Sequence, residues 1–191
     1  PQKLTSASTP PTSRARVLGQ GVRIAIFDTG LSAPDSSFLH PVNVTDWTSE
    51  NQTHDRVGHG TFIAGVIAGT MTGCSGLAPE ALITTYRIFT GTQTSYTSWF
   101  LDAFNHVMHT GADVVTLAIG GPDNMDEPFV DKVNEVSAAG IVIVSAIGND
   151  GPIYGTLSNP ADMMEVVGIG GVERDGRIAP FSSRGMTTQE L

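Results

Sequence analysis

The segment Val57-Gly58-His59-Gly60-Thr61-Phe62-Ile63-Ala64-Gly65 places a histidine between two glycines at the start of an apolar run. Small and apolar residues continue to Gly69, which predicts a buried helix that begins at or just after His59. The N-terminal end of a helix dipole favours a neutral imidazole, and a general base must be neutral to accept a proton. The same pattern also fits a histidine that merely caps a core helix, so this segment alone leaves both interpretations open.

The composition is that of one globular domain. The chain has 191 residues, of which 40% are apolar and 15% are charged, so we expect a folded core. The net charge of -9 argues against a nucleic-acid partner. No apolar run approaches the ~18 residues that a membrane-spanning helix needs, so we expect no membrane anchor in this chain. The single cysteine, Cys74, cannot form an internal disulfide bond.

The N-terminal region and the first long polar segment have distinct compositions. Residues 1–16 are rich in Pro, Ser and Thr without an apolar period, which predicts a flexible leader before a folded unit over residues 17–191. Residues 32–56 are predicted to form a long loop. This loop carries two glycosylation sequons, at Asn43 and Asn51, which are compatible with a secretory route.

Apolar strands alternate with helices through the rest of the chain. Strands are predicted at residues 22–27, 81–89, 114–119, 141–146 and 166–169. Helices are predicted from Thr97 or Ser98, either of which could cap the helix, to His109, and from Asp126 to Gly140. This alternation is typical of an α/β fold, with a mostly parallel sheet and helices on both faces. Such sheets bind ligands at the carboxyl ends of their strands, so polar residues there are candidates for a site.

Three polar residues stand at strand or helix ends. Asp28 closes the strand 22–27, His59 opens a helix, and Asn149 follows the strand 141–146. An aspartate bonded to one imidazole nitrogen fixes the tautomer and leaves the other nitrogen free to take a proton from a nucleophile. An asparagine amide can donate a hydrogen bond to an oxyanion that develops during acyl transfer.

Three motifs carry a resemblance to a known family. Phe27-Asp28-Thr29-Gly30, Gly58-His59-Gly60-Thr61 and Gly148-Asn149-Asp150-Gly151, in this order, resemble those of the subtilisin-like serine proteases. The resemblance extends from about Val17 to Leu191. It implies a serine-type endopeptidase that needs no cofactor for its chemistry. In that scheme Asp28 is the aspartate of a Ser-His-Asp triad, His59 is the general base and Asn149 is the oxyanion donor.

The resemblance also implies where a substrate binds. Residues 117–121 would pair with an extended peptide as an added strand, and residues 145–148 would form the opposite wall of the primary pocket. The substrate-binding residues expected on this basis are Leu117, Ala118, Ile119, Gly120, Gly121, Ala146 and Gly148.

The nucleophile of the family is not found in these 191 residues. It lies in a Gly-Thr-Ser-x-Ala segment, so we expect that serine, its helix and the last strands beyond Leu191, and a fold that is incomplete at its C-terminus. Ser182 and Ser183 match a different segment of the family. The alternative function is a catalytically inactive truncated form that only binds a peptide or a partner protein. A third interpretation takes Phe27-Asp28-Thr29-Gly30 as an aspartic protease motif, but it requires an all-β fold and leaves His59 unexplained.

Further expectations about partners come from the resemblance alone. They are a protein or peptide substrate and the protein's own propeptide. The family includes a luminal enzyme that cleaves membrane-bound precursor proteins, which implies the lumen of the endoplasmic reticulum or Golgi. Family members often bind structural calcium, but no complete set of oxygen ligands can be selected from this sequence, so no metal ligand is predicted.

Overall fold

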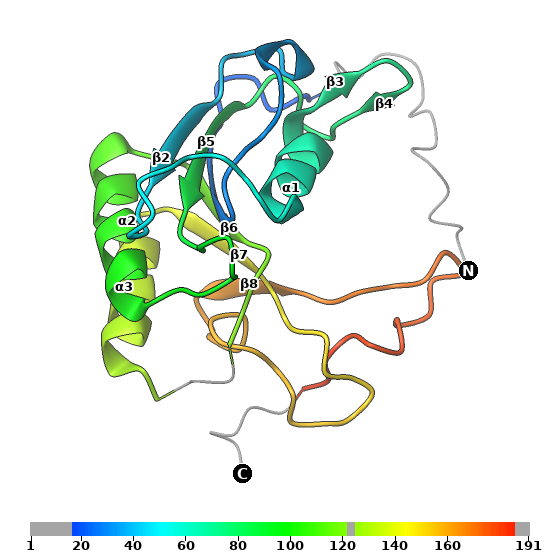
Figure 1. Ribbon diagram of the computed structural model, residues 1–191. Helices are drawn as coiled ribbons and strands as arrows, with labels where there is room; N and C mark the ends of the chain where they lie inside the picture. The colour runs from blue at the N-terminus through cyan, green and yellow to red at the C-terminus, as the bar shows by residue number, and fades with distance from the viewer. Residues whose placement is uncertain (1–16, 122–124, 186–191) are drawn as a thin grey trace.

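One parallel sheet forms the centre of the molecule (Figure 1). The computed structural model describes residues 17–121 and 125–185, so the predicted leader at residues 1–16 lies outside the described part. The strands are ordered β2-β5-β1-β6-β7-β8, and every neighbouring pair is parallel. Their bounds are β1 Arg23–Asp28, β2 Asn43–Asp46, β5 Leu82–Arg87, β6 Val114–Leu117, β7 Val142–Ala146 and β8 Val166–Ile169. The predicted α/β class with a mostly parallel sheet is confirmed.

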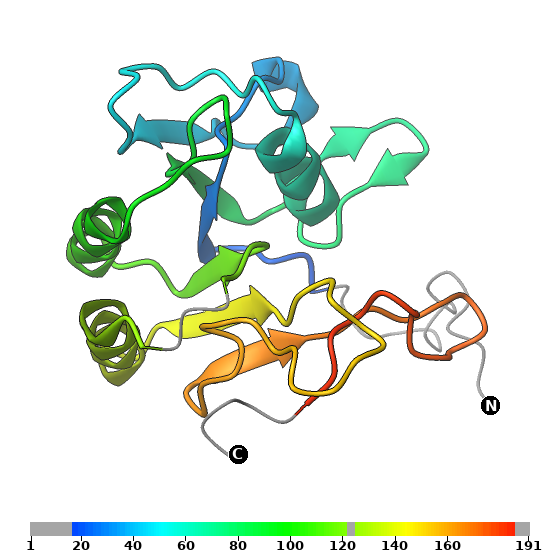
Figure 2. The same ribbon diagram turned by 60° about the horizontal axis from the view of Figure 1, so that its bottom comes forward.

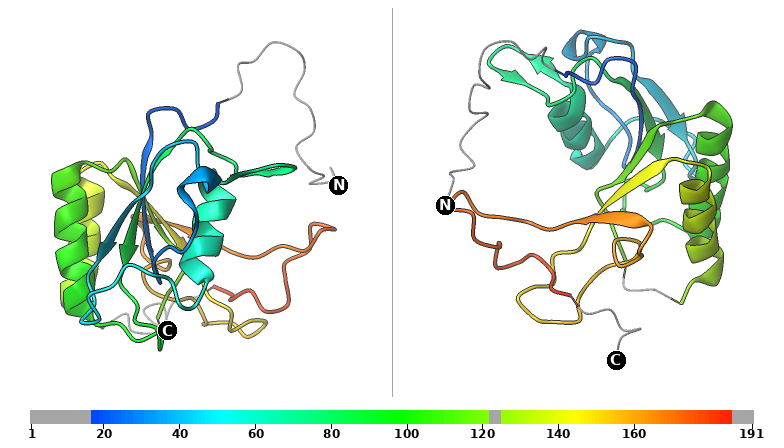
Figure 3. Two further views of the ribbon diagram at one scale, coloured as in Figure 1. Left: turned by 45° about the horizontal axis from the view of Figure 1, so that its top comes forward. Right: turned by 180° about the vertical axis from the view of Figure 1, so that it is seen from behind.

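Helices lie on both faces of this sheet, as predicted (Figure 3). Helix α1, His59–Ala68, lies on one face, and α2, Thr97–Thr110, lies beside α3, Glu127–Ala138, on the other. A small hairpin, β3 Thr70–Met71 and β4 Cys74–Ser75, projects beyond the end of α1 (Figure 2). A short 3-10 helix, η1, spans Asp35–Ser37.

The alternation of side chains along β1 builds a separate core on each face. Phe27 packs on the side of α2 and α3, in a cluster that includes Phe104 and Val133. Ile26 packs on the opposite side against Ala64 and other small residues of α1. Strand β1 therefore contributes side chains to both cores. Packing on its two faces holds its carboxyl end in place.

Helix α1 covers only part of its face of the sheet. It contacts β1 and β5, whereas β8 lies at the far edge. Val166 of β8 belongs to the core on the side of α2 and α3, so Val167 and Ile169 point to the other face, where they are 50% and 52% exposed. This part of the sheet presents apolar side chains at the surface.

Two local predictions were wrong. Residues 32–56 are not entirely a loop, because β2 pairs with β5 at the sheet edge; its sequence Asn-Val-Thr-Asp has too few apolar residues to reveal a strand. Neither Thr97 nor Ser98 caps α2: its N-cap is Tyr96, without a side-chain cap. The Thr97 hydroxyl instead donates to Asp126, the carboxylate that caps α3.

Candidate active site

Asp28 and His59 are in direct contact. Asp28 is the last residue of β1 and is 1% exposed, while His59 is the first residue of α1. The Nδ1 atom of His59 lies 2.8 Å from Oδ1 and 2.9 Å from Oδ2 of Asp28. An ionised carboxylate only accepts hydrogen bonds, so with Asp28 ionised the donor of this contact is Nδ1, and in the neutral imidazole Nε2 is then the acceptor. The His59 side chain is 43% exposed, in contrast to its buried partner.

Two glycines allow this contact. Gly58, before α1, has a φ of 89°, a conformation that residues with a side chain rarely adopt. Gly60 lies so close to the end of β1 that a Cβ atom on it would be 2.4 Å from the Gly30 carbonyl oxygen and 3.1 Å from Oδ1 of Asp28. The glycines that flank His59 therefore let the start of the helix approach Asp28.

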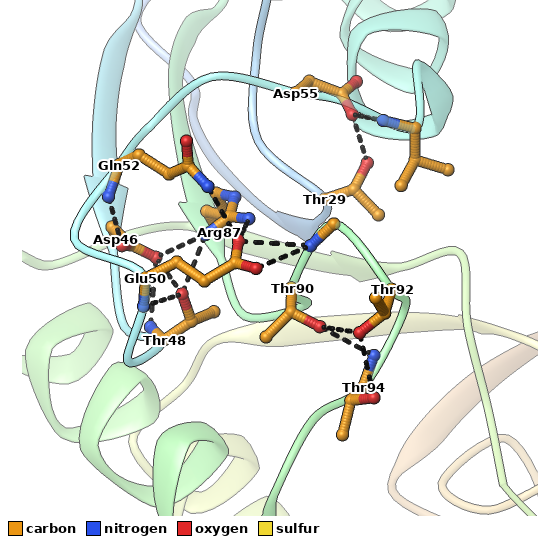
Figure 4. Close-up of polar contacts among 12 residues, drawn as sticks. Thr29, Asp46, Thr48, Glu50, Gln52, Asp55, Arg87, Thr90, Thr92 and Thr94 are labelled. Atoms are coloured by element: carbon orange, nitrogen blue, oxygen red, sulfur yellow. Dashed lines mark hydrogen bonds and ion pairs between the residues drawn. The ribbon is translucent and has the colours of Figure 1, made fainter.

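A second carboxylate, Asp55, contacts Thr29, the residue that follows Asp28, and was not predicted as a site residue (Figure 4). Its Oδ1 accepts hydrogen bonds from the amides of Val57, at 3.0 Å, and Gly58, at 2.8 Å, and from the Thr29 hydroxyl, at 2.8 Å. Its Oδ2 accepts from the amide and hydroxyl of Thr61, at 2.9 and 2.6 Å. Burial alone would raise the pKa of Asp55, but these hydrogen bonds outweigh it and hold the pKa below its usual value. The sequence signal that could have indicated Asp55 is an aspartate placed three residues before Gly58, just ahead of the predicted helix.

The exposed side of His59 opens into a pocket of about 200 Å³. A larger pocket of about 300 Å³ lies next to it, and the two share Phe89 and Ile119. Ala118 lines the first pocket, and Leu117, Gly120 and Gly121 line the second. Five of the seven predicted substrate-binding residues therefore border one continuous surface that begins at His59.

The larger part of this surface is apolar, and several of its residues, Phe89 and Gln93 among them, were not predicted as site residues. Gln93 faces the same pocket as His59 and has a φ of 62°, which is uncommon for a residue with a side chain. Phe89 lies on the same loop, just after β5. Neither phenylalanine nor glutamine is typical of a substrate site, so no sequence pattern indicated these two residues.

The backbone of Gly121 is already paired. It donates to the Asn159 carbonyl at 3.1 Å and accepts from the Asn159 amide at 2.8 Å. An added strand could therefore pair along Ala118, Ile119 and Gly120, but not through these groups of Gly121.

Asn149 lies at the same edge of the sheet as Asp28. It follows β7, which is separated from β1 by β6, and its side chain is exposed. Ala146 ends β7, and Gly148 precedes Asn149 in the turn. Ser183 holds this turn, because its amide donates to the Gly148 carbonyl at 3.1 Å and its hydroxyl accepts from the Asp150 amide at 3.1 Å.

Ser182 and Ser183 are 1% and 2% exposed. The Ser182 hydroxyl accepts from the Gly171 amide at 3.0 Å, so both serines hold loops together. Both hydroxyls are therefore buried and occupied by structural hydrogen bonds.

A buried arginine organises the loop that follows β2 and carries the second sequon, at Asn51 (Figure 4). Arg87 is 0% exposed and donates to Asp46 at 3.1 Å, to Thr48 at 2.8 Å and to Glu50. Hydrogen bonds from Arg87, Gln52 and the Gly91 amide lower the pKa of Glu50 to about 2. The side chains of Asn43, on β2, and Asn51, in this loop, are exposed.

The described residues offer neither a metal cluster nor a membrane-spanning helix. Within residues 17–121 and 125–185, no three His, Cys, Asp or Glu side chains gather to bind a metal ion. None of the helices in this part of the chain is both long and apolar enough to cross a membrane. A calcium site is therefore not assigned.

Comparison with known proteins identifies the family. The subtilase family matches residues 19–190, so the chain belongs to this family of serine proteases. The predicted family is confirmed. The chain is 57% identical over 173 residues to the human membrane-bound transcription factor site-1 protease, covering 91% of this chain and 16% of that protein. It is 56% identical to the subtilisin-like protease SBT6.1 of Arabidopsis thaliana, covering 91% of this chain and 17% of that protein.

More distant relatives include bacterial enzymes. The chain is 30% identical to the major intracellular serine protease of Bacillus subtilis, covering 87% of this chain and 56% of that enzyme. The chain thus spans about a sixth of the length of the first two relatives and about half of the bacterial one.

Proposed function

We propose that the chain is part of the peptidase domain of a serine endopeptidase, in which Asp28 and His59 are two members of a Ser-His-Asp triad. The observation that supports this most directly is the contact of His59 Nδ1 with both oxygens of Asp28, beside a pocket. In this proposal the third member is a serine in a Gly-Thr-Ser-x-Ala segment outside the 191 residues.

The reaction would proceed through an acyl-enzyme. The serine Oγ attacks the scissile carbonyl carbon while Nε2 of His59 takes the hydroxyl proton, and the buried Asp28 carboxylate stabilises the imidazolium. The carbonyl oxygen gains negative charge, which the Asn149 amide stabilises by a hydrogen bond. His59 then returns the proton to the leaving amine, and a water molecule releases the acyl group in a second cycle. No step of this scheme requires a cofactor.

The substrate is a protein or peptide bound as an extended strand. Ala118, Ile119 and Gly120 would supply the pairing backbone, and the apolar pocket bounded by Leu117 and Phe129 would accept an apolar side chain. Ala146 and Gly148 would form the opposite wall. We further propose that the protein's own propeptide occupies the same surface before activation.

Location and processing role are proposed from the similarity to site-1 protease. We propose a luminal enzyme of the secretory pathway that cleaves secretory or membrane precursor proteins. The exposed sequons at Asn43 and Asn51 support this, because N-glycans are added only on that route. Treatment of the natural protein with an N-glycosidase tests the proposal: a mass decrease that the Asn43→Gln and Asn51→Gln variants abolish supports it, and an unchanged mass contradicts it.

The catalytic assignment is tested in the complete natural protein with a fluorogenic peptide library. His59→Ala and Asp28→Asn should each lower kcat by about 10⁴-fold, with the fold retained by circular dichroism. If the natural protein cleaves no peptide but still binds peptides along residues 118–120, the inactive, peptide-binding alternative holds instead.

A further inference from the structure

We propose that Asp55 is a positioning residue for catalysis, one that holds Asp28 and His59 in register without touching the substrate. The inference rests on the function proposed above, because it assigns Asp55 a role in the same triad. It is based on the hydrogen bonds of the Asp55 carboxylate, which connect the start of α1 to the end of β1.

Asp55 connects both halves of the catalytic pair. Its partners Val57 and Gly58 come immediately before His59, and Thr61 stands two residues after it on α1. Its other partner, Thr29, follows Asp28 at the end of β1. One buried group, 5% exposed, therefore binds the helix start that carries the imidazole and the strand end that carries the carboxylate.

The start of α1 depends on this contact. The residue before α1 is Gly58, which has no side chain to satisfy the first amides of the helix, and α1 has no side-chain cap. Asp55 acts as the cap from outside the helix, because its carboxylate accepts hydrogen bonds from the amides of Gly58 and Thr61. A charge-assisted bond of this kind is stronger than a neutral one and sets the position of the first turn.

Through the Thr29 hydroxyl, Asp55 also influences which hydrogen bonds Asp28 accepts. This hydroxyl lies 2.8 Å from Oδ1 of Asp55 and 3.2 Å from Oδ1 of Asp28, and it accepts from the Gly60 amide at 3.0 Å. Because it has one proton, donation to Asp55 withholds that proton from Asp28. The Asp28 oxygens then accept from the Thr29 amide, at 2.8 Å, and from His59. Without the Asp55 charge the hydroxyl would turn to Asp28 and compete with the imidazole.

Asp46 provides a matched control. It is also a well-shielded carboxylate, with 8% side-chain exposure, and it accepts from Thr48, the Gln52 amide and Arg87. These contacts hold the loop of residues 46–52 and do not reach α1 or Thr29. If losing a buried carboxylate affects activity only by weakening the fold, kcat should change equally when Asp55 or Asp46 is replaced.

The test compares Asp55→Asn with Asp46→Asn in the complete natural protein. Both variants should unfold at lower denaturant concentration. Per folded enzyme, Asp55→Asn should lower kcat about 10- to 100-fold with KM within about twofold, because a small misplacement of catalytic groups affects chemistry more than binding. Asp46→Asn should leave kcat and KM within about twofold. Equal kcat for the two variants would overturn the proposal.

A second pair of variants covers the case in which Asp55→Asn does not fold. Thr61→Val removes the 2.6 Å hydroxyl bond to Asp55 and the 3.0 Å bond that the Ser32 amide donates to the same hydroxyl, and Thr61→Ser retains both. We expect kcat to fall several-fold in the first and to stay within about twofold of wild type in the second; an unchanged kcat in Thr61→Val would contradict the proposal. A His59→Ala variant with wild-type kcat would refute the proposed function itself, whereas a loss in His59→Ala without a loss in Asp55→Asn would refute only the positioning role.

Discussion

Gly60 offers a sharp test of how α1 and β1 build the catalytic pair. A Cβ atom at this position would lie 2.4 Å from the Gly30 carbonyl oxygen, about 0.6 Å short of the 3.0 Å that real Cβ contacts respect. Because the neighbour is backbone, the start of α1 must move away from β1 in Gly60→Ala. Overpacking of this kind costs roughly 1–3 kcal/mol, and helix propensity returns at most about 1 kcal/mol of that.

The same displacement should damage catalysis. His59 and Gly60 are adjacent, so a shift of the first turn changes the 2.8 Å contact of His59 with Asp28. A misplacement approaching 1 Å can lower the rate about 100-fold. We therefore expect Gly60→Ala to lower both the free energy of unfolding and kcat in the complete protein, measured by urea denaturation and peptide hydrolysis.

Gly65→Ala is the matched control. It lies in the same helix, and a Cβ atom there would have no neighbour within 4 Å. Alanine should stabilise the helix by about 0.4–1 kcal/mol through lower chain entropy in the unfolded state, with kcat unchanged. If Gly60→Ala proves as stable and as active as Gly65→Ala, the close approach of α1 to β1 is not what positions His59.

Two further predictions concern charge and hydrogen bonding. Asn149→Ala should lower kcat about 10²- to 10³-fold, the usual cost of losing one oxyanion donor, with KM nearly unchanged in the same peptide assay. A change in KM alone would argue against an oxyanion role. The pKa of Glu50 is lowered from 4.5 to about 2, so its contribution to stability is complete above about pH 4.5 and is lost as the pH falls toward 2. Glu50→Gln should therefore flatten the pH dependence of the unfolding free energy across this range, and a slope equal to that of the wild type would contradict the ion pair with Arg87.

The elements with strong sequence patterns were predicted well. The apolar runs at β1, β6 and β7 are strands, and α1 begins at His59, where an apolar run follows Gly58. Helix α3 starts after the Asp126 cap, because an acid followed by proline is a strong local signal. These predictions succeed because burial imposes the pattern directly on the residues concerned.

The features that were missed depend on distant partners. β2 is a short polar strand that exists because β5 offers an open edge. Thr97 leaves the end of its own helix to bind Asp126, 29 residues away. In the sequence, Asp55 is one acidic residue in a polar loop, and its role depends on contacts with Thr29 and Thr61 that only the fold creates. Residue type gave the candidates for the pair Asp28 and His59, but only the three-dimensional structure revealed what supports them.

The most direct test of the proposed serine protease is covalent labelling with a fluorophosphonate, which reacts with an activated serine. The complete natural protein should be labelled at one serine outside residues 1–191, identified by peptide mass spectrometry. The His59→Ala variant should lose the label, because its serine has no base to accept the proton. Absence of labelling in the wild type, or labelling that persists without His59, would contradict the assignment of Asp28 and His59 to a catalytic triad.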